Sequence, residues 1–117
     1  MKRFSSDKPV AAVVDNIKQI LSEKQIKIFT VFDHAQEAKQ VGLVLPATQV
    51  IVFGDPKVGT FLMQEDNQVA LDLPLKILVW EDKGQTWIGY HQPSLLGRSF
   101  QLAKHQGILD KMDGLMA

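Results

Sequence analysis

The sequence contains no cysteine among its 117 residues. Disulfides, thiolate metal ligands and thiol nucleophiles are therefore excluded. No sign of charge dominates either, because thirteen Lys and Arg residues balance thirteen Asp and Glu residues. Electrostatic binding to nucleic acid requires an excess of basic side chains, so the balanced charge argues against nucleic acid as a partner.

Long apolar runs are also absent from the sequence. No stretch approaches the roughly 20 apolar residues that cross a bilayer, and the basic start leads into no apolar segment typical of a signal peptide. We therefore expect a cytoplasmic protein without a membrane partner. Hydrophobic residues make up 45% of the chain, which is enough for one domain, residues 1–117, with a core of its own.

Apolar residues recur at helical spacing near the start of the chain, at Val10, Val13, Val14, Ile17 and Leu21. This spacing predicts an amphipathic helix over residues 8–24. Ser6 or Asp7 is expected to cap it, and Pro9 is expected in its first turn, where no backbone N–H is needed.

The rest of the chain alternates between strand and helix patterns. Strands are predicted at residues 26–32, 48–53, 75–80 and 86–90, with a short edge strand at 2–5. Helices are predicted at residues 34–41, 56–65 and 93–104, and the segment 81–85 joins the clearest hairpin. These elements predict an α+β fold, a two-layer sandwich with one mixed but mainly antiparallel sheet of about five strands backed by helices.

Many short motifs follow one another through the middle of the chain. They are Phe32-Asp33-His34-Ala35, Val41-Gly42-Leu43, Pro46-Ala47-Thr48, Val52-Phe53-Gly54-Asp55-Pro56-Lys57-Val58-Gly59-Thr60, Leu62-Met63-Gln64, Ala70-Leu71-Asp72-Leu73-Pro74-Leu75-Lys76 and Val79-Trp80-Glu81-Asp82. In order and spacing they closely resemble the bacterial family called domain of unknown function 302, over about residues 10–105. The resemblance implies a small α+β sandwich that tends to pair into homodimers. It implies no agreed reaction, substrate or catalytic residues.

The chain departs from the family pattern in two places. Asp55 stands where the family pattern leads us to expect Asn in Gly-Asn-Pro, and His91-Gln92-Pro93 stands where Asn often precedes Asp-Pro. Both departures leave the expected fold intact. They weaken any claim that side chains at these two places carry fixed chemistry.

Asp33 and His34 are the first candidates for acid/base chemistry. A carboxylate and an imidazole at the end of a strand can serve as an acid and a base. A structural explanation is stronger, because Asp33 occupies a helix N-cap position and Gln36 completes a capping box. We therefore interpret Asp33 as a cap.

The segment from Gly54 to Thr60 is the most suggestive candidate site. A strand leads through a glycine turn into a helix, where backbone N–H groups can hold an anion. Gly54 and Gly59 even have the glycine spacing of a P-loop. However, Thr60 and Phe61 replace the Lys and Ser or Thr that a P-loop requires, which disfavours a nucleoside triphosphate.

The same segment also has a purely structural interpretation. Asp55 can cap the helix, Pro56 can occupy its first position, and Gly59 can let the helix pack closely on the sheet. Lys57, near the helix start, is a candidate partner for a carboxylate or phosphate group. Taken together, the pattern assigns a candidate ligand site to Gly54, Lys57, Gly59 and Thr60.

Two further candidates, Asp72 and Lys76, precede and begin the predicted hairpin. Asp72 can brace the corner before Leu73-Pro74. Lys76 shares one strand face with Leu78 and Trp80, so a functional role would place it at a pocket rim beside Tyr90 or Asp72.

Metal and cofactor binding find little support. The histidines His34, His91 and His105 are scattered, and neither Ser94 nor Ser99 has the glycines of a nucleophile elbow. We expect no metal and no cofactor. The aromatic residues Phe53, Phe61, Trp80 and Trp87 are interpreted as core rather than as the lining of a pocket.

An apolar tail ends the chain at Leu109, Met112, Leu115 and Met116. Exposed Met and Leu side chains favour a contact with another protein surface. We therefore expect a homodimer, formed through this tail or through an uncovered sheet edge.

Three hypotheses about function follow. The first is a small dimeric module that binds an apolar or anionic small molecule near residues 54–60. The second is a small enzyme that carries out acid/base chemistry with Asp33, His34, Asp72 or Lys76. The third is a purely structural or regulatory homodimer. The choice between enzyme and binding module stays open, and the binding module is favoured.

Overall fold

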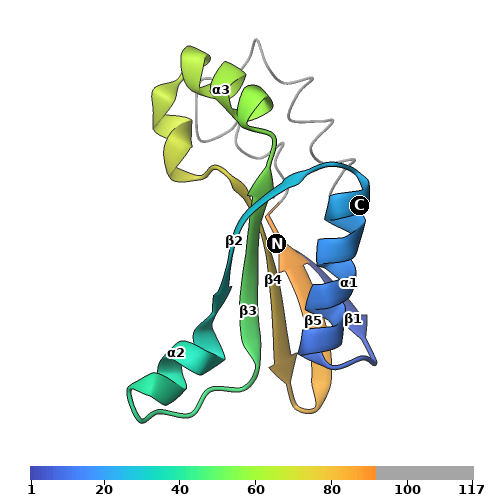
Figure 1. The fold of residues 1–117 in the computed structure, drawn as a ribbon. Coiled ribbons are helices and arrows are strands. Elements are labelled where there is room, and N and C mark those ends of the chain that lie inside the picture. Colours follow the sequence, from blue (N-terminus) through green and yellow to red (C-terminus); the bar gives the residue numbers. More distant parts are fainter. Residues whose placement is uncertain (92–117) are drawn as a thin grey trace.

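The computed structural model describes residues 1–91, in which five strands form one antiparallel sheet (Figure 1). The sheet has the order β1-β5-β4-β3-β2. Its strands are β1 (Lys2–Ser6), β2 (Lys27–Asp33), β3 (Thr48–Gly54), β4 (Leu75–Asp82) and β5 (Gln85–Tyr90). The helices are α1 (Val10–Glu23), α2 (His34–Gln40), α3 (Pro56–Glu65) and a short 3₁₀ helix, η1 (Asn67–Leu71). The predicted α+β fold and the sheet of about five strands are confirmed.

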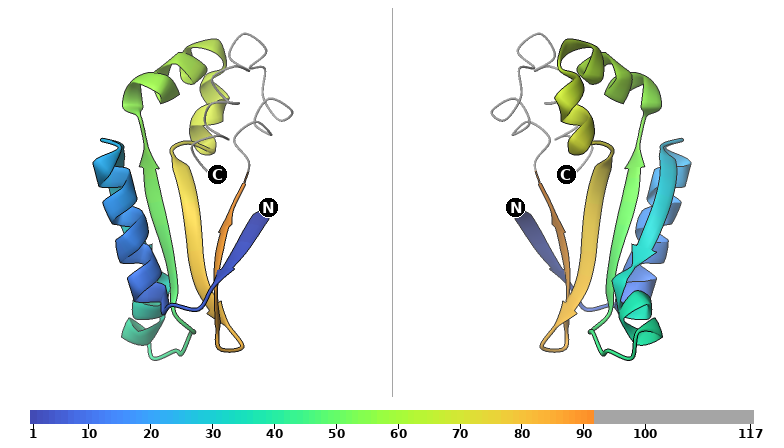
Figure 2. Two further views of the ribbon diagram at one scale, coloured as in Figure 1. Left: turned by 90° about the vertical axis from the view of Figure 1, so that its right-hand side faces the viewer. Right: turned by 90° about the vertical axis from the view of Figure 1, so that its left-hand side faces the viewer.

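Helix α1 covers one face of the sheet (Figure 2). Its buried residues are the members of the predicted apolar stripe: Val10, Val13, Val14 and Leu21. Because side chains alternate between the faces of a strand, Ile51 and Phe53 of β3 point toward α1 together with Val79 of β4. This layer between α1 and the sheet is the main hydrophobic core.

The start of α1 differs from the prediction. The helix begins at Val10 rather than near residue 8, and its N-cap is Pro9, which makes no side-chain cap. Proline disfavours the helical conformation at the residue before it, which keeps Lys8 outside the helix. Ser6, one of the two predicted caps, instead accepts a hydrogen bond from the backbone N–H of Lys8 through its Oγ, at 3.2 Å.

The other two α-helices lie at opposite ends of the sheet instead of backing its face (Figure 1). Each begins directly after a strand, α2 after β2 and α3 after β3. Helix η1 follows α3, and the sequence patterns did not predict it. Asp66 caps η1, because its Oδ1 accepts a hydrogen bond from the backbone N–H of Gln68 at 3.0 Å.

The hairpin between β4 and β5 closes through Lys83 and Gly84, which have φ angles of 52° and 77°. Two successive positive φ angles are typical of the tight turns that match the twist of paired strands. The register places Trp80 opposite Trp87, with ring centroids 6.5 Å apart. Both rings are half-buried on the sheet face away from α1, so these two residues lie outside the main core.

Several sequence predictions fall outside the described residues. They are the helix at residues 93–104, Ser94, Ser99, His105, and the apolar tail with Leu109, Met112, Leu115 and Met116.

Candidate functional site

The turn between β3 and α3 is built as the sequence predicts. Asp55 is the N-cap of α3, and its Oδ1 accepts a hydrogen bond from the backbone N–H of Lys57 at 2.9 Å. Pro56 occupies the first helical position, where its missing N–H costs nothing. The backbone N–H of Gly59 donates to the carbonyl of Asp55 at 3.0 Å. Two backbone N–H groups of the first turn of α3, those of Lys57 and Gly59, therefore already have acceptors within the chain.

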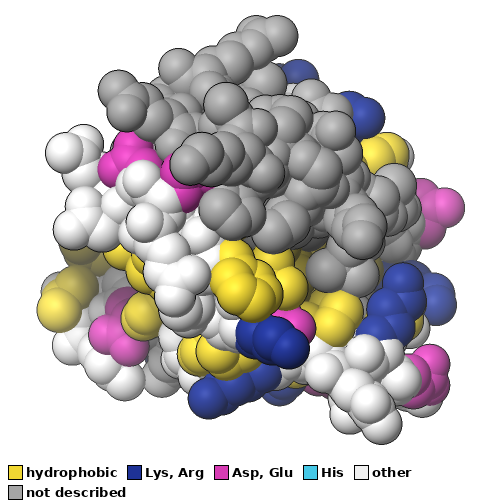
Figure 3. Space-filling model, turned by 90° about the horizontal axis from the view of Figure 1, so that it is seen from above, with side chains coloured by type: hydrophobic (Ala, Val, Ile, Leu, Met, Phe, Trp, Pro, Cys, Tyr) yellow, Lys and Arg dark blue, Asp and Glu magenta, His cyan; other side chains and the backbone are white. Residues whose placement is uncertain are grey.

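A cavity of about 640 Å³ opens beside this turn, and we call it the α3 cavity. Its described lining residues are mostly apolar: Ile26, Phe29, Gly54, Asp55, Pro56, Val58, Gly59, Thr60, Phe61, Met63, Leu73, Pro74 and Leu75. In the view of this end of the molecule, several hydrophobic side chains are visible, with basic and acidic side chains beside them (Figure 3). Size and lining are typical of pockets that hold small organic molecules.

Three separate segments of the chain form the walls of the α3 cavity. The turn and α3 form one wall, the approach to β4 forms a second, and Ile26 and Phe29 form a third. Phe29 lies where the pairing of β2 with β3 shifts register, between Ile28 and Thr30. An extra residue in a strand bends it and re-aims a side chain. Phe29 thereby joins the cavity wall, with its ring near Gly54.

The polar groups of the α3 cavity are few. Asp55 is the single charged residue among its described lining residues. The Oγ1 of Thr60 donates to the carbonyl of Pro56 at 2.7 Å, so this hydroxyl is turned toward its own helix. The second carboxylate oxygen of Asp55, Oδ2, makes no hydrogen bond within residues 1–91. Among the side chains of the described lining, this oxygen is the charged acceptor that is left for a hydrogen bond from a ligand.

Only some of the predicted site residues near this turn belong to the cavity wall. Gly54, Gly59 and Thr60 line the α3 cavity, whereas Lys57 does not. Gly59 does not sit against the sheet as we expected: a Cβ atom there would lie 3.7 Å from Met63 and 3.9 Å from Leu73, both ordinary contacts. Phe61, which we assigned to the core, instead lines the cavity.

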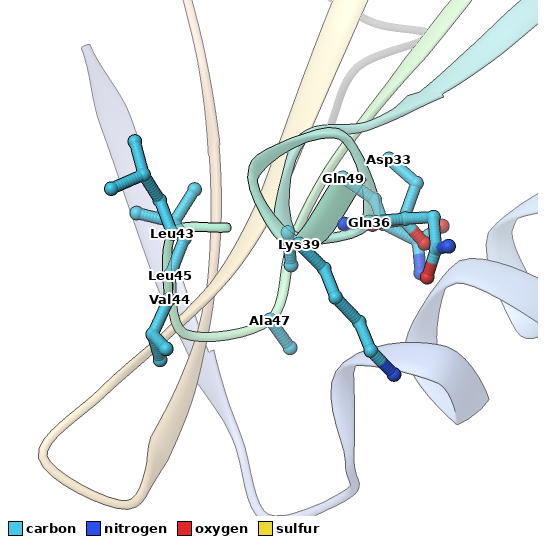
Figure 4. A pocket seen from close by; sticks show the side chains of 9 residues that line it. Asp33, Gln36, Lys39, Leu43, Val44, Leu45, Ala47 and Gln49 are labelled. Atoms are coloured by element: carbon cyan, nitrogen blue, oxygen red, sulfur yellow. The ribbon is translucent and has the colours of Figure 1, made fainter. Parts of the chain in front are cut away.

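A smaller cavity of about 390 Å³ lies at the opposite end of the sheet, and we call it the α2 cavity. Polar Asp33, Gln36, Lys39 and Gln49 and apolar Ala35, Leu43, Val44, Leu45 and Ala47 line it (Figure 4). The Oδ1 of Asp33 accepts a hydrogen bond from the backbone N–H of Gln36 at 3.0 Å, which confirms the predicted cap.

The four candidates for acid/base chemistry do not come together. Asp33 lies opposite Gln49, and Lys76 lies opposite Val52. From the rise and spacing of strands, the Cα atoms of Asp33 and Lys76 are about 14 Å apart. Asp72 follows η1, at the end of the sheet where α3 lies. Acid/base chemistry shared among the four residues therefore has no geometric support.

The contacts of these candidates are local. His34 stacks on the ring of Phe32, with centroids 6.2 Å apart. The Nζ of Lys76 donates to the carbonyl of Pro74 at 3.3 Å. Tyr90, the partner that we considered for Lys76, is buried in the core on the α1 side, so the two side chains lie on opposite faces of the sheet.

Residues 1–91 contain no group of three or more His, Asp or Glu side chains placed to hold a metal ion. None of their helices combines the length and the apolar character needed to cross a membrane.

Comparisons with known proteins add a family and a fold. The family model described as domain of unknown function DUF302 matches residues 2–117. Relatives called fluoride-specific ion channels, FluC 1 of Brucella suis biovar 1 and of Brucella abortus biovar 1, are 37% identical over 94 residues, or 80% of this chain. This chain spans 37% and 35% of their lengths.

A solved structure has the same fold. It is the crystal structure of an uncharacterized conserved DUF302 protein from Bacillus stearothermophilus, with a TM-score of 0.85 and 16% sequence identity. The match covers 97% of this chain and 89% of that chain.

Proposed function

Because the chain belongs to the DUF302 family, whose description assigns no ligand or reaction, we propose a function from its own cavity: the protein is a binding module for an apolar small molecule. The α3 cavity is the observation that carries this proposal. Its volume of about 640 Å³ suits a small organic molecule, and Phe29, Phe61 and Leu75 offer it apolar surface.

The geometry favours an apolar ligand over an anionic one. Helix N-termini hold anions through free N–H groups and a positive dipole end. Here the carboxylate of Asp55 already accepts from the N–H of Lys57 and sets a negative charge at that point. The side chain of Lys57, the predicted anion partner, is not part of the cavity wall.

A neutral fluorescent dye tests the proposal. Nile red should gain fluorescence in the presence of the protein, because the dye moves from water into an apolar site. Gly59→Phe fills the cavity and should abolish the gain. Gln64→Phe adds the same ring at an exposed position of α3 outside the cavity wall, and it should leave the gain intact. Equal dye binding by both variants would exclude the α3 cavity as the site.

Native mass spectrometry asks the same question without a chosen ligand. A retained compound should add mass to the purified protein, and this mass should disappear on denaturation. Gly59→Phe should lose the added mass, and Gln64→Phe should keep it.

A second candidate function is a structural or regulatory homodimer. It rests on the loop from Val41 to Leu45, which we call the apolar loop. Val44 is 98% exposed and Leu43 is 66% exposed, and exposed apolar groups of this kind favour protein contacts. The double change Leu43→Ser with Val44→Ser should convert a dimer to a monomer in sedimentation experiments. A dimer that persists would place the interface elsewhere.

The fluoride-channel relatives support the shared module and no more. They match this chain over about a third of their own lengths, so the proposed function concerns the matched module and not ion transport.

A further inference from the structure

We propose that the ligand of the α3 cavity carries a hydrogen-bond donor, a hydroxyl or a protonated amine, which binds the carboxylate of Asp55, and that Asp55 excludes ligands with a carboxylate. This inference rests on the proposed binding function and names the chemical class of the ligand. It makes Asp55 a residue that determines specificity in addition to its role as a helix cap.

The two oxygens of the Asp55 carboxylate differ in their hydrogen bonds, and this difference supports the proposal. Oδ1 accepts the N–H of Lys57 and completes the cap. Oδ2 has no partner within residues 1–91, and Asp55 is one of the residues that line the cavity. An ionised carboxylate can only accept hydrogen bonds, so its free oxygen calls for a donor. A ligand that supplies one gains a charge-assisted hydrogen bond beside an otherwise apolar wall.

The cations near the cavity do not reverse this preference. The Nζ of Lys27 lies 4.9 Å from the centre of the Phe29 ring, but Lys27 is absent from the described lining. Lys57 is likewise absent, and Lys76 donates to the carbonyl of Pro74. The one charged side chain that belongs to the described lining is therefore the acidic Asp55.

A substitution at position 55 can separate the two roles of Asp55, as a helix cap and as a binding group. Asparagine caps a helix about as well as aspartate does, but it carries no charge. It is also the residue that the family resemblance led us to expect here. Asp55→Asn should therefore keep the fold and the cavity while it removes the preference, which makes it a clean test.

Three compounds of one shape provide the measurement. 4-Butylbenzylamine, 4-butylbenzyl alcohol and 4-butylbenzoate differ in the group at one end, and each competes with Nile red for the full-length protein at neutral pH. We expect the amine and the alcohol to displace the dye at lower concentrations than the benzoate. Because Asp55 is exposed, water screens its charge, and a ratio of about fivefold between amine and benzoate is expected.

Variants of the protein test whether Asp55 causes the difference between the amine and the benzoate. In Asp55→Asn the amine and the benzoate should become nearly equal. Asp33→Asn, the same change at the other helix cap, should leave the ratio unchanged, as should Lys27→Gln. Equal displacement by all three compounds in the natural protein, or tightest binding by the benzoate, would overturn the role of Asp55 while leaving the cavity as a site. Dye binding that survives Gly59→Phe would overturn the proposed function itself.

Discussion

Two strand-to-helix turns of this protein can be compared directly. β2 passes through Asp33 into α2, and β3 passes through Asp55 into α3, and in both turns the aspartate caps the helix through Oδ1. The outcomes differ. α2 has seven residues and none is buried, whereas α3 has ten and buries Leu62 completely. An aspartate therefore caps both helices, through the N–H of Gln36 in α2 and of Lys57 in α3, but only α3 is anchored by a fully buried apolar residue.

The cavities at the two ends reflect this difference. At the α2 end, four of the nine lining residues are polar or charged, and the neighbouring apolar loop is exposed. At the α3 end, the wall is mostly apolar and η1 packs against α3. The short helix without an anchor therefore lies beside a smaller cavity of mixed lining, and the anchored helix lies beside a larger cavity of mostly apolar lining.

The largest expected effect comes from removing the anchor. Leu62→Ala should lower the free energy of unfolding by about 2–5 kcal/mol, because Leu62 is fully buried and its loss leaves a cavity. The matched change at the other end, Leu43→Ala, should cost less than about 0.5 kcal/mol, because Leu43 is exposed. Urea unfolding measures both. Similar losses would mean that the two ends contribute alike to stability.

The helix caps should have an intermediate and nearly equal effect. Asp33→Ala and Asp55→Ala each remove one cap and should each lower stability by about 1 kcal/mol. The corresponding Asn variants should lose much less. Thermal melting measures the four changes, and a cost confined to one helix would show that the two aspartate caps differ in energy.

The smallest expected effect has the opposite sign. Gly59→Ala should raise stability by about 0.5–1 kcal/mol, because alanine is a better helix former and its methyl group meets only ordinary contacts. The methyl group also points toward Met63 and Leu73, which line the α3 cavity. Affinity for Nile red should therefore fall as the melting temperature rises. A rise in both would show that the ligand lies away from Gly59.

Local features of the fold could be predicted from the sequence. The caps at Asp33 and Asp55 and the turn at Gly84 each depend on a few neighbouring residues, so their patterns were sufficient. η1 was missed because five residues show no helical period, although Asp66 followed by Asn67 and Gln68 is a possible capping signal. The start of α1 was placed too early because apolar spacing outweighed the restriction that Pro9 imposes on Lys8.

Of the candidate site, only the residues that are close together in the sequence could be predicted. Gly54, Gly59 and Thr60 were found because they follow one another in sequence. Phe29 and Leu73 were missed as lining residues, because the pairing of distant strands and a shift in register bring them to the cavity. Lys57 was predicted as a site residue because of its charge. It does not line the cavity, because its position on the surface of α3 decides which groups it can contact.

The pairing of β1 with β5 has a consequence for how the chain folds. Lys2 lies opposite Tyr90, so β1, the first strand of the described residues to be synthesised, can pair only after β5, the last of them, has been synthesised. Closing so long a loop costs on the order of 4 kcal/mol in chain entropy before any ladder bond forms. During synthesis β2, β3 and β4 can associate as they emerge, while β1 remains an unpaired edge strand. We expect β1 to dock late, which makes the nascent chain most vulnerable to misassociation at the edge that β5 will cover.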